Sequence, residues 1–266
     1  MRDSIATPGH PRLASRSCLL VVTLAALTGC ATTPVALPRH VAPTPSATAT
    51  PTPTPSSTPT PAGWQLSAGE SLIAVTKQSS VVVRSRWGGP RRWWLHNPNA
   101  SGAPLIFLVV AQRGDGWDVR VPARPNGGVG WVRDSDVQLQ VDPYAVRASL
   151  HRRVLAVYKN GRVIRVMRIG VGRPSAPTPT GDFFLTELLQ AANPNGAYGP
   201  YAYGTSAFSD VFSEFEGGPG QIGVHGTNDP SSIGRNVSHG CLRLGAQDIR
   251  ALAQMVPAGT PLTITP

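Results

Sequence analysis

A run of alternating prolines limits where this chain can fold. Between Val41 and Ala62 the sequence is almost wholly Pro, Thr, Ser and Ala. Proline fixes φ and removes a backbone donor, so this stretch is excluded from the interior of a helix or sheet and favours extended polyproline II. A stalk, a sheddable linker and a glycosylated spacer all fit this composition. We therefore interpret residues 30–62 as a Pro/Thr-rich linker and expect the folded part of the chain to follow it.

The residues before the linker are arranged like a bacterial secretory signal. A basic N-terminal segment precedes the apolar run Cys18–Leu27, which is too short to span a bilayer as a stable helix. The run leads into Leu27-Thr28-Gly29-Cys30, which resembles the lipobox of bacterial lipoproteins. The resemblance implies a signal peptide over residues 1–29 and a lipid on Cys30 that anchors the mature chain to a membrane, outside the cytoplasm. An ordinary secretory signal cleaved nearby is the alternative.

The use of cysteine points to a reactive thiol. The chain has three cysteines. Cys18 is expected to leave with the signal peptide and Cys30 to carry a lipid, which leaves Cys241 as the one cysteine with a free thiol. A chain with one free cysteine outside the cytoplasm cannot be a disulfide scaffold. Cys241 is therefore a candidate nucleophile.

The formal net charge of +10 suits a polyanionic environment such as nucleic acid, anionic lipid or cell-wall polymer. Export argues against nucleic acid, and the sequence has neither a basic helix nor an aromatic RNA-binding motif. We expect no nucleic-acid partner. An arginine-rich composition that reflects genomic base bias explains the charge equally well.

Residues 63–141 have the texture of a small all-β domain. Short apolar runs there are separated by Gly, Pro, Asn and Asp, as strands are by turns. The runs are Val81–Val83, Leu105–Ala111, Trp117–Val121 and Val129–Val132. The second half of this segment resembles the bacterial Src-homology-3-like barrel. Trp93 and Trp94 stand beside two arginines in a loop-like stretch and are candidates for exposure to glycan or a partner.

Residues 142–266 are long enough for a second domain. Two apolar runs, Val154–Tyr158 and Val163–Ile169, flank Asn160-Gly161, which is a strong hairpin signal. Further strands are predicted at Phe183–Leu188, Ile222–His225 and Pro261–Thr265, and a helix at Ala246–Met255. The predicted fold class is mainly β with one or two short helices, preceded by a small β-barrel-like domain.

The chemistry of this second domain gathers around Cys241. A thiol attacks a carbonyl as thiolate, so it needs a proton acceptor and backbone amides aimed at the developing oxyanion. His225 and His239 both lie within sixteen residues of the cysteine, and Gly240 permits a tight turn beside it. Zinc is the competitor, but His239-Gly240-Cys241 lacks ligand spacing and no further residue completes a set. We expect neither a metal nor a cofactor.

The motifs around these residues resemble a known family. His225-Gly226-Thr227, followed by Ser238-His239-Gly240-Cys241-Leu242-Arg243-Leu244, is similar to the signature of the L,D-transpeptidase (YkuD-type) catalytic domain. The upstream stretch Pro177-Thr178-Pro179-Thr180-Gly181-Asp182-Phe183 also matches the family's Pro-Thr-Gly element. The resemblance covers nearly all of residues 142–266.

The resemblance implies a role for each matching residue. Cys241 would be the nucleophile, and His225 the base, with its other ring nitrogen held by a backbone carbonyl near Gly226. The backbone amides from His239 to Cys241 would form the oxyanion hole, with the Ser238 hydroxyl and the His239 ring in support. The implied catalytic set is Cys241, His225, Gly226, Ser238, His239 and Gly240.

Residues for substrate binding are less sharply indicated. Arg243 would either hold a substrate carboxylate or brace its own loop through bidentate hydrogen bonds. The segment 198–215 is rich in glycine and aromatic residues and is expected to be either an active-site lid or a flap packed on the domain. Within it, Tyr201 and Tyr203 are candidates for contact with the wall.

The implied reaction is the cross-linking of peptidoglycan. Cys241 would take up the third residue of a tetrapeptide stem as a thioester, which an amine of a neighbouring stem resolves to a 3–3 link, and carbapenem-type β-lactams would acylate the same thiol. Water as acceptor would make the protein an L,D-carboxypeptidase, and a protein acceptor would make it a protein-to-wall acyltransferase. An inactive wall-binding lipoprotein is the alternative outside enzymes. In each case the chain is expected to be a membrane-anchored lipoprotein that reaches into the wall.

Overall fold

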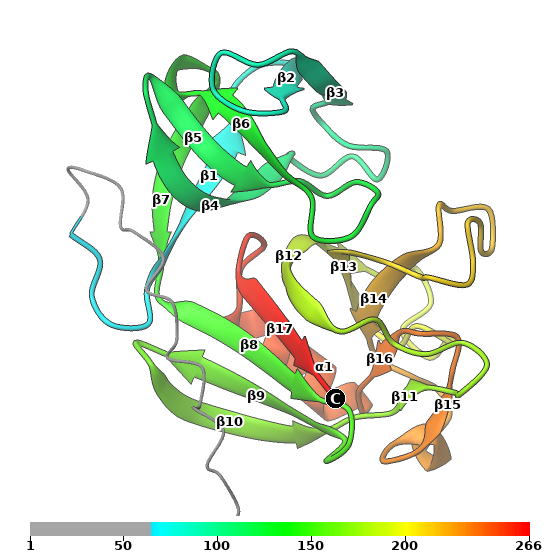
Figure 1. The fold of residues 1–266 in the computed structure, drawn as a ribbon. Helices are drawn as coiled ribbons and strands as arrows, with labels where there is room; N and C mark the ends of the chain where they lie inside the picture. Colours follow the sequence, from blue (N-terminus) through cyan, green and yellow to red (C-terminus); the bar gives the residue numbers. More distant parts are fainter. Residues whose placement is uncertain (1–64) are drawn as a thin grey trace, which may run out of the picture. The chain divides into compact units, whose positions relative to one another are not determined.

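The computed structural model describes residues 65–266, all within one compact unit. The predicted signal peptide, the predicted lipidation site Cys30 and the predicted Pro/Thr-rich linker lie outside the described residues. Within them the chain forms two β-sheets, one two-stranded ladder and one α-helix (Figure 1). The predicted fold class, mainly β with a short helix, is confirmed.

The first sheet is antiparallel and has seven strands, in the order β3-β2-β6-β5-β4-β1-β7. They are β1 (Ser71–Thr76), β2 (Ser80–Arg84), β3 (Arg91–His96), β4 (Ile106–Arg113), β5 (Gly116–Arg120), β6 (Val129–Arg133) and β7 (Val137–Asp142), with a 3-10 turn at Asp134–Asp136. The sheet curls around its own core, where Phe107, Trp117 and Val119 are buried. Alternate residues of each strand supply this core because successive side chains point to opposite faces of a sheet.

Trp93 and Trp94 lie in strand β3, so the loop-like assignment of these residues is wrong. Trp93 pairs with Val83 across the ladder with β2 and packs against the core of the first sheet. Trp94 points the other way and leaves 57% of its surface exposed. In an edge strand, exposed and more buried side chains alternate, but two arginines followed by two tryptophans do not show this alternation in the sequence.

The second sheet has eight strands in the order β10-β9-β8-β17-β12-β13-β14-β16. Its strands are β8 (Tyr144–Ser149), β9 (Val154–Lys159), β10 (Arg162–Arg168), β12 (Gly181–Gln190), β13 (Tyr201–Phe208), β14 (Gln221–His225), β16 (Leu242–Arg243) and β17 (Pro261–Thr265). A separate ladder pairs β11 (Val171–Gly172) with β15 (Asn236–Ser238), and a 3-10 turn spans Pro230–Ser232.

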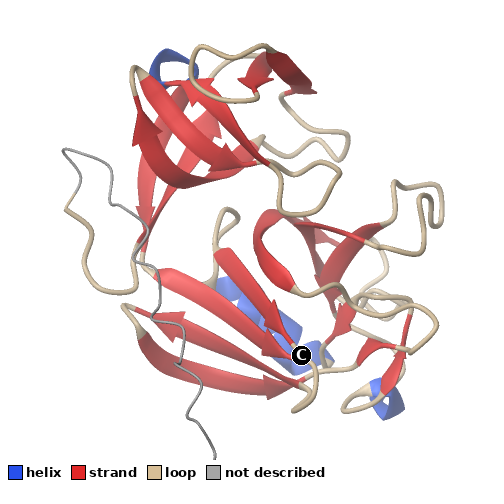
Figure 2. Cartoon of the chain, in the orientation of Figure 1, coloured by secondary structure: helices blue, strands red, loops and turns tan. Residues whose placement is uncertain are grey.

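Local sequence signals explain the clearest elements of this sheet. Asn160 and Gly161 connect β9 to β10 with φ values of 48° and 74°, and two positive φ angles in succession are what a type I′ hairpin turn requires. The helix α1 (Ala246–Met255) has the predicted bounds, and Ile249 and Leu252 bury its apolar face in the core. Figure 2 shows how few helical residues there are beside the strands.

Candidate active site

Two neighbouring strands bring together the cysteine and the histidine of the sequence motifs. β14 and β16 are parallel, and His225 at the end of β14 pairs in register with Arg243. Cys241 comes directly before β16 and lies beside Gly223 of β14, whose amide donates a hydrogen bond of 3.3 Å to the thiol sulfur. Sheet register thus places Cys241 and His225 at one edge.

The side chains of Cys241 and His225 both lie close to Gly223. A Cβ added at this glycine would lie 3.8 Å from Sγ of Cys241 and 3.6 Å from Cδ2 of His225. The thiol and the imidazole therefore flank the same bare stretch of backbone. Glycine at this position keeps the space between nucleophile and base open.

His225 is buried and held in one orientation. Its Nδ1 lies 2.5 Å from the carbonyl oxygen of Gly226, as the sequence predicted, and only a protonated Nδ1 can donate to that acceptor. The other ring nitrogen, Nε2, is then free to accept a proton. The pKa of His225 is lowered to about 4, chiefly by burial and to a smaller extent by the nearby Arg243 guanidinium, while the hydrogen bond to the Gly226 carbonyl opposes the shift.

The pKa of the Cys241 thiol is raised, whereas that of His225 is lowered. Burial raises its pKa because it disfavours the thiolate, and the hydrogen bond from Gly223 and the charge of Arg243 offset part of this effect. At neutral pH the resting pair is accordingly a neutral thiol beside a neutral imidazole. Neither group then carries a charge in the buried site.

The turn before Cys241 is fixed from two sides. Gly240 has a φ of 120°, which favours glycine. The hydroxyl of Ser238 donates to the carbonyl of Cys241 at 2.7 Å and accepts from the amide of Gly240 at 3.1 Å. The buried hydroxyl of Thr178 donates to the carbonyl of Gly240 at 2.8 Å. Thr178 belongs to the Pro-Thr-Gly element, which sequence reasoning had not connected to this turn.

The backbone amides of this turn differ in whether they already donate a hydrogen bond. The amide of Gly240 already donates a hydrogen bond to the Ser238 hydroxyl. It is therefore not free to bind an oxyanion, contrary to what the resemblance had implied. Among the described residues, the amides of His239 and Cys241 have no hydrogen-bond acceptor. These two amides remain available to an oxyanion.

A loop over residues 209–220, which we call the aromatic loop, packs on the ring of His239. The ring of Phe215 lies 5.1 Å from His239 between centroids, and that of Phe212 lies 5.9 Å away in an edge-on arrangement. His239 thus carries the loop that closes one side of the site. This contact suits structural support better than proton transfer.

Tyr198 is a residue of the site that sequence reasoning missed. Its ring lies 4.7 Å from that of His225, and its hydroxyl donates a hydrogen bond of 2.6 Å to the carboxylate of Glu216. Burial and this acceptor both raise the pKa of Tyr198. Glu216 belongs to the aromatic loop, so Tyr198 ties the loop to the base. Only proximity in space relates these residues, which explains why no local motif revealed them.

The remaining predicted residues fall into two groups. Arg243 has a buried Nε without a hydrogen-bond partner among the described residues, and its charge lies close enough to His225 and Cys241 to lower the pKa of both. Tyr203 is only 1% exposed, and its hydroxyl lies 2.7 Å from the carbonyl of Val256, so the prediction that it contacts the wall is wrong. Tyr201 is half-buried and packs on the same core.

The lid prediction also needs correction. Tyr201–Phe208 is strand β13, with neighbours on both sides, and cannot be part of a lid. What remains of the segment is the aromatic loop and the stretch before β13 that carries Tyr198. The long apolar and aromatic run of β13 had been read as part of one connection.

The thiol opens into a cavity of about 200 Å³. Its walls include Cys241, His225, Tyr198, Phe215 and Gln221. In the range 65–266 no group of three or more His, Cys, Asp or Glu side chains could hold a metal ion. No helix of that range is long and apolar enough to cross a membrane.

Comparisons with known proteins agree with this site. Residues 143–264 match the model of the L,D-transpeptidase catalytic domain, YkuD. YkuD of Bacillus licheniformis, which is named as an L,D-transpeptidase, is 37% identical over 124 residues, or 47% of this chain and 67% of that protein. YkuD of Bacillus subtilis is 36% identical over 122 residues, covering 46% of this chain and 66% of that protein. The chain belongs to the L,D-transpeptidase (YkuD) family.

Solved structures give a weaker match. The crystal structure of an Enterococcus faecium L,D-transpeptidase C442S mutant aligns with 23% identity and a TM-score of 0.35, covering 46% of this chain and 50% of that one. The chain thus spans about two thirds of the Bacillus proteins and half of this solved structure.

Proposed function

We propose that this protein is an L,D-transpeptidase that forms 3–3 cross-links in peptidoglycan, with Cys241 as nucleophile and His225 as general base. The observation that carries the proposal is the arrangement at Gly223, where the thiol and the imidazole flank one glycine in a cavity. The family membership of residues 143–264 supports the same reaction.

In the acylation step, Nε2 of His225 takes the proton of the thiol while Sγ attacks the carbonyl of the third residue of the donor stem. The carbonyl oxygen becomes an oxyanion, which the amides of His239 and Cys241 can bind. The tetrahedral intermediate then expels the amine of the terminal D-alanine, which receives the proton from His225. A thioester on Cys241 remains.

In the second step, an amine of a neighbouring stem attacks the thioester and gives its proton to His225. The C–S bond breaks, an amide bond forms, and the proton returns to the thiol. The neutral resting pair fits this sequence because the proton moves only when a substrate carbonyl is in place. The positive charge of Arg243, which acts on both His225 and Cys241, would attract a carboxylate of a stem.

The N-terminal residues supply a location for this reaction. We propose that the lipid on Cys30 anchors the chain and that the Pro/Thr-rich linker spaces the folded part from the membrane. At about 3.1 Å per residue, the proline-rich part of the linker, Val41–Ala62, would span up to roughly 70 Å toward the wall.

The test incubates the purified full-length chain with a disaccharide-tetrapeptide and identifies the products by mass spectrometry. A dimer joined through the third residues, absent with Cys241→Ala, is the expected result. Tripeptide alone would assign an L,D-carboxypeptidase. No product, together with no carbapenem adduct on Cys241, would overturn the proposal in favour of a wall-binding protein.

A further inference from the structure

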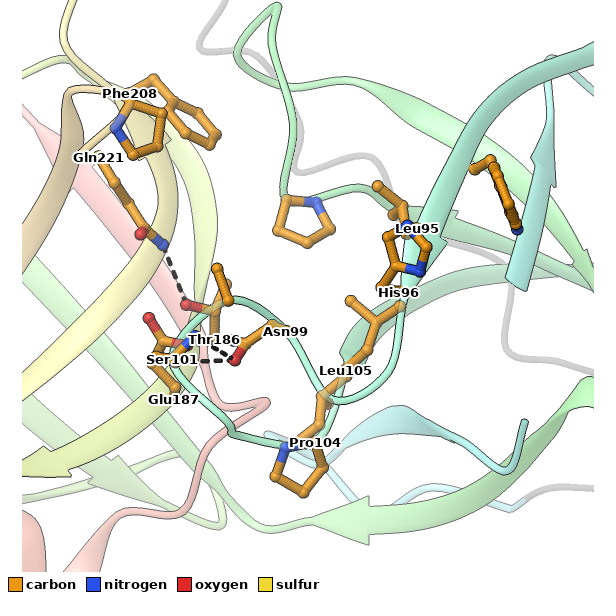
Figure 3. Close-up of a pocket in the computed structure, with 15 residues that line it drawn as sticks. Leu95, His96, Asn99, Ser101, Pro104, Leu105, Thr186, Glu187, Phe208 and Gln221 are labelled. Atoms are coloured by element: carbon orange, nitrogen blue, oxygen red, sulfur yellow. Dashed lines mark hydrogen bonds between the residues drawn. The ribbon is translucent and has the colours of Figure 1, made fainter. Parts of the chain in front are cut away.

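A second cavity, of about 370 Å³, adjoins the one at the thiol. We call it the Trp94 cavity. Figure 3 shows its walls: the end of β3 and the segment that follows it on one side, and β12, Phe208 and Gln221 on the other. Its volume falls within the range of about 300–1,000 Å³ that is typical of small-ligand sites.

The two cavities share a wall. Glu187, Pro219 and Gln221 line both of them. The two cavities therefore lie on either side of these three residues, and a ligand that extends across them from the thiol cavity would reach the Trp94 cavity. The reacting part and a remote part of one substrate would then be held by adjoining sites.

The polar side chains that line the Trp94 cavity are held in place by hydrogen bonds. The nearly buried carboxylate of Glu187 accepts hydrogen bonds from the Ser101 hydroxyl at 2.6 Å and from the Asn99 amide (Figure 3). Gln221 donates to the Thr186 hydroxyl at 3.2 Å and to the carbonyl of Thr205 at 2.7 Å. The polar groups of this cavity are thus positioned before any ligand arrives.

The rim of the cavity is aromatic and apolar. Trp94 is 57% exposed, and the His96 ring lies 5.1 Å from its ring. Phe208, Pro104 and Pro122 add apolar surface. An exposed tryptophan offers a flat apolar face with one polar edge, which suits a ligand that has both a face of C–H groups and polar substituents.

The charged residues around the Trp94 cavity indicate which ligands it can bind. Among the described residues that line the Trp94 cavity, none is lysine or arginine, although the whole chain carries a formal net charge of +10. The only carboxylate there, that of Glu187, already accepts two hydrogen bonds. A ligand carboxylate would find no cation in this cavity, whereas a neutral N-acetylated sugar ring would find an apolar face and fixed polar groups.

We propose that the Trp94 cavity binds a neutral amino-sugar ring of the glycan to which the donor stem is attached. The proposal rests on the proposed function, since that function places the stem in the thiol cavity. Contact with Trp94 then adds affinity for donors that carry their glycan and leaves the chemical step at Cys241 unchanged.

The test measures binding apart from turnover. Full-length Cys241→Ala is titrated calorimetrically with a disaccharide-tetrapeptide and with the free tetrapeptide. The expected Kd is about five- to tenfold lower for the disaccharide form, the size of one good aromatic contact. Adding Trp94→Ala should abolish this difference. Trp87→Ala is the matched control, because Trp87 is 59% exposed in the turn between β2 and β3 and lies outside the cavity lining.

A second variant places a large side chain in the Trp94 cavity. Ala100 is exposed and lines the cavity, so Ala100→Trp should weaken binding of the disaccharide form without disturbing the fold. Equal Kd values for the two ligands, or an equal loss for both with Trp94→Ala, would overturn the proposal. If such a result came with normal cross-linking by the wild type, the proposed function would stand and only the sugar site would fail. A wild type without product and without a carbapenem adduct would instead refute the function.

Discussion

The guanidinium of Arg124 donates a hydrogen bond of 2.8 Å to the carbonyl oxygen of Phe212, whose ring packs on His239 beside the thiol. The same guanidinium also bonds the carbonyls of Ser209 at 2.9 Å and Pro219 at 3.2 Å. One side chain from the segment between β5 and β6 therefore ties both ends of the aromatic loop together. The first sheet contributes to the site by holding this loop.

Arg124→Ala should lower kcat/KM about tenfold or more, because three hydrogen bonds from a charged donor are lost and the loop loosens over His239. Arg124→Lys should restore only part of the activity, since an ammonium cannot match the fork geometry of guanidinium. Arg120→Ala is the control: it removes a 3.3 Å ion pair with Asp182 but no contact to the loop. Equal rates for Arg124→Ala and Arg120→Ala would show that the loop does not depend on Arg124.

Cys30→Ser should move the protein from the membrane fraction to the soluble fraction, because the lipid would have no attachment site. Cys18→Ser is the matched control, since Cys18 is expected to leave with the signal peptide and its loss should not change the attachment. Fractionation followed by immunoblotting separates the two outcomes. Membrane attachment that persists in Cys30→Ser would indicate an uncleaved anchor instead.

Sequence signals predicted those parts of the fold that depend on near neighbours. The helix at Ala246–Met255 followed from apolar spacing, and the turn at Asn160-Gly161 followed from the need for positive φ. The two motifs that contain His225 and Cys241 predicted that these residues act together, and the structure brings both side chains beside Gly223. Local chemistry was sufficient in each case.

The rest depended on contacts between distant segments. Tyr203 was expected at the surface, but the pairing of β13 with β12 and β14 places it in the core. The contact of Tyr198 with His225 and the hold of Arg124 on the aromatic loop join residues far apart in sequence. No periodicity or spacing encodes such contacts, because they arise only when the strands have found their register.

The pH dependence of kcat/KM should reveal the buried base. A general base acts in its neutral form, and the lowered pKa of His225 keeps it neutral down to about pH 4. The acidic limb of kcat/KM should therefore lie near pH 4 rather than near the ordinary value of 6.5. His239→Ala should keep this limb while lowering the rate, whereas an acidic limb that disappears in His239→Ala would make His239 the base.

Gly223→Ala tests the geometry on which the proposed function depends. The added methyl would lie 3.8 Å from Sγ of Cys241 and 3.6 Å from Cδ2 of His225, and 3.3 Å from the carbonyl of Tyr203. The contacts to Sγ and Cδ2 would be ordinary van der Waals contacts, whereas the contact to the Tyr203 carbonyl would be tight. The methyl would therefore fill the space between the thiol and the imidazole and shift the backbone of β14, and a displacement of about 1 Å can cost about a hundredfold in rate. We therefore expect kcat to fall by about ten- to a hundredfold, with only a small change in the melting temperature.

Gly245→Ala is the matched control for this substitution. Gly245 caps the start of α1 with a φ of −62°, and a Cβ there would meet nothing within 4 Å. The control should keep wild-type kcat, and the rate at which a carbapenem acylates Cys241 should follow the same order. A Gly223→Ala variant that is acylated as fast as Gly245→Ala would mean that the reaction at the thiol does not depend on the free space beside Gly223.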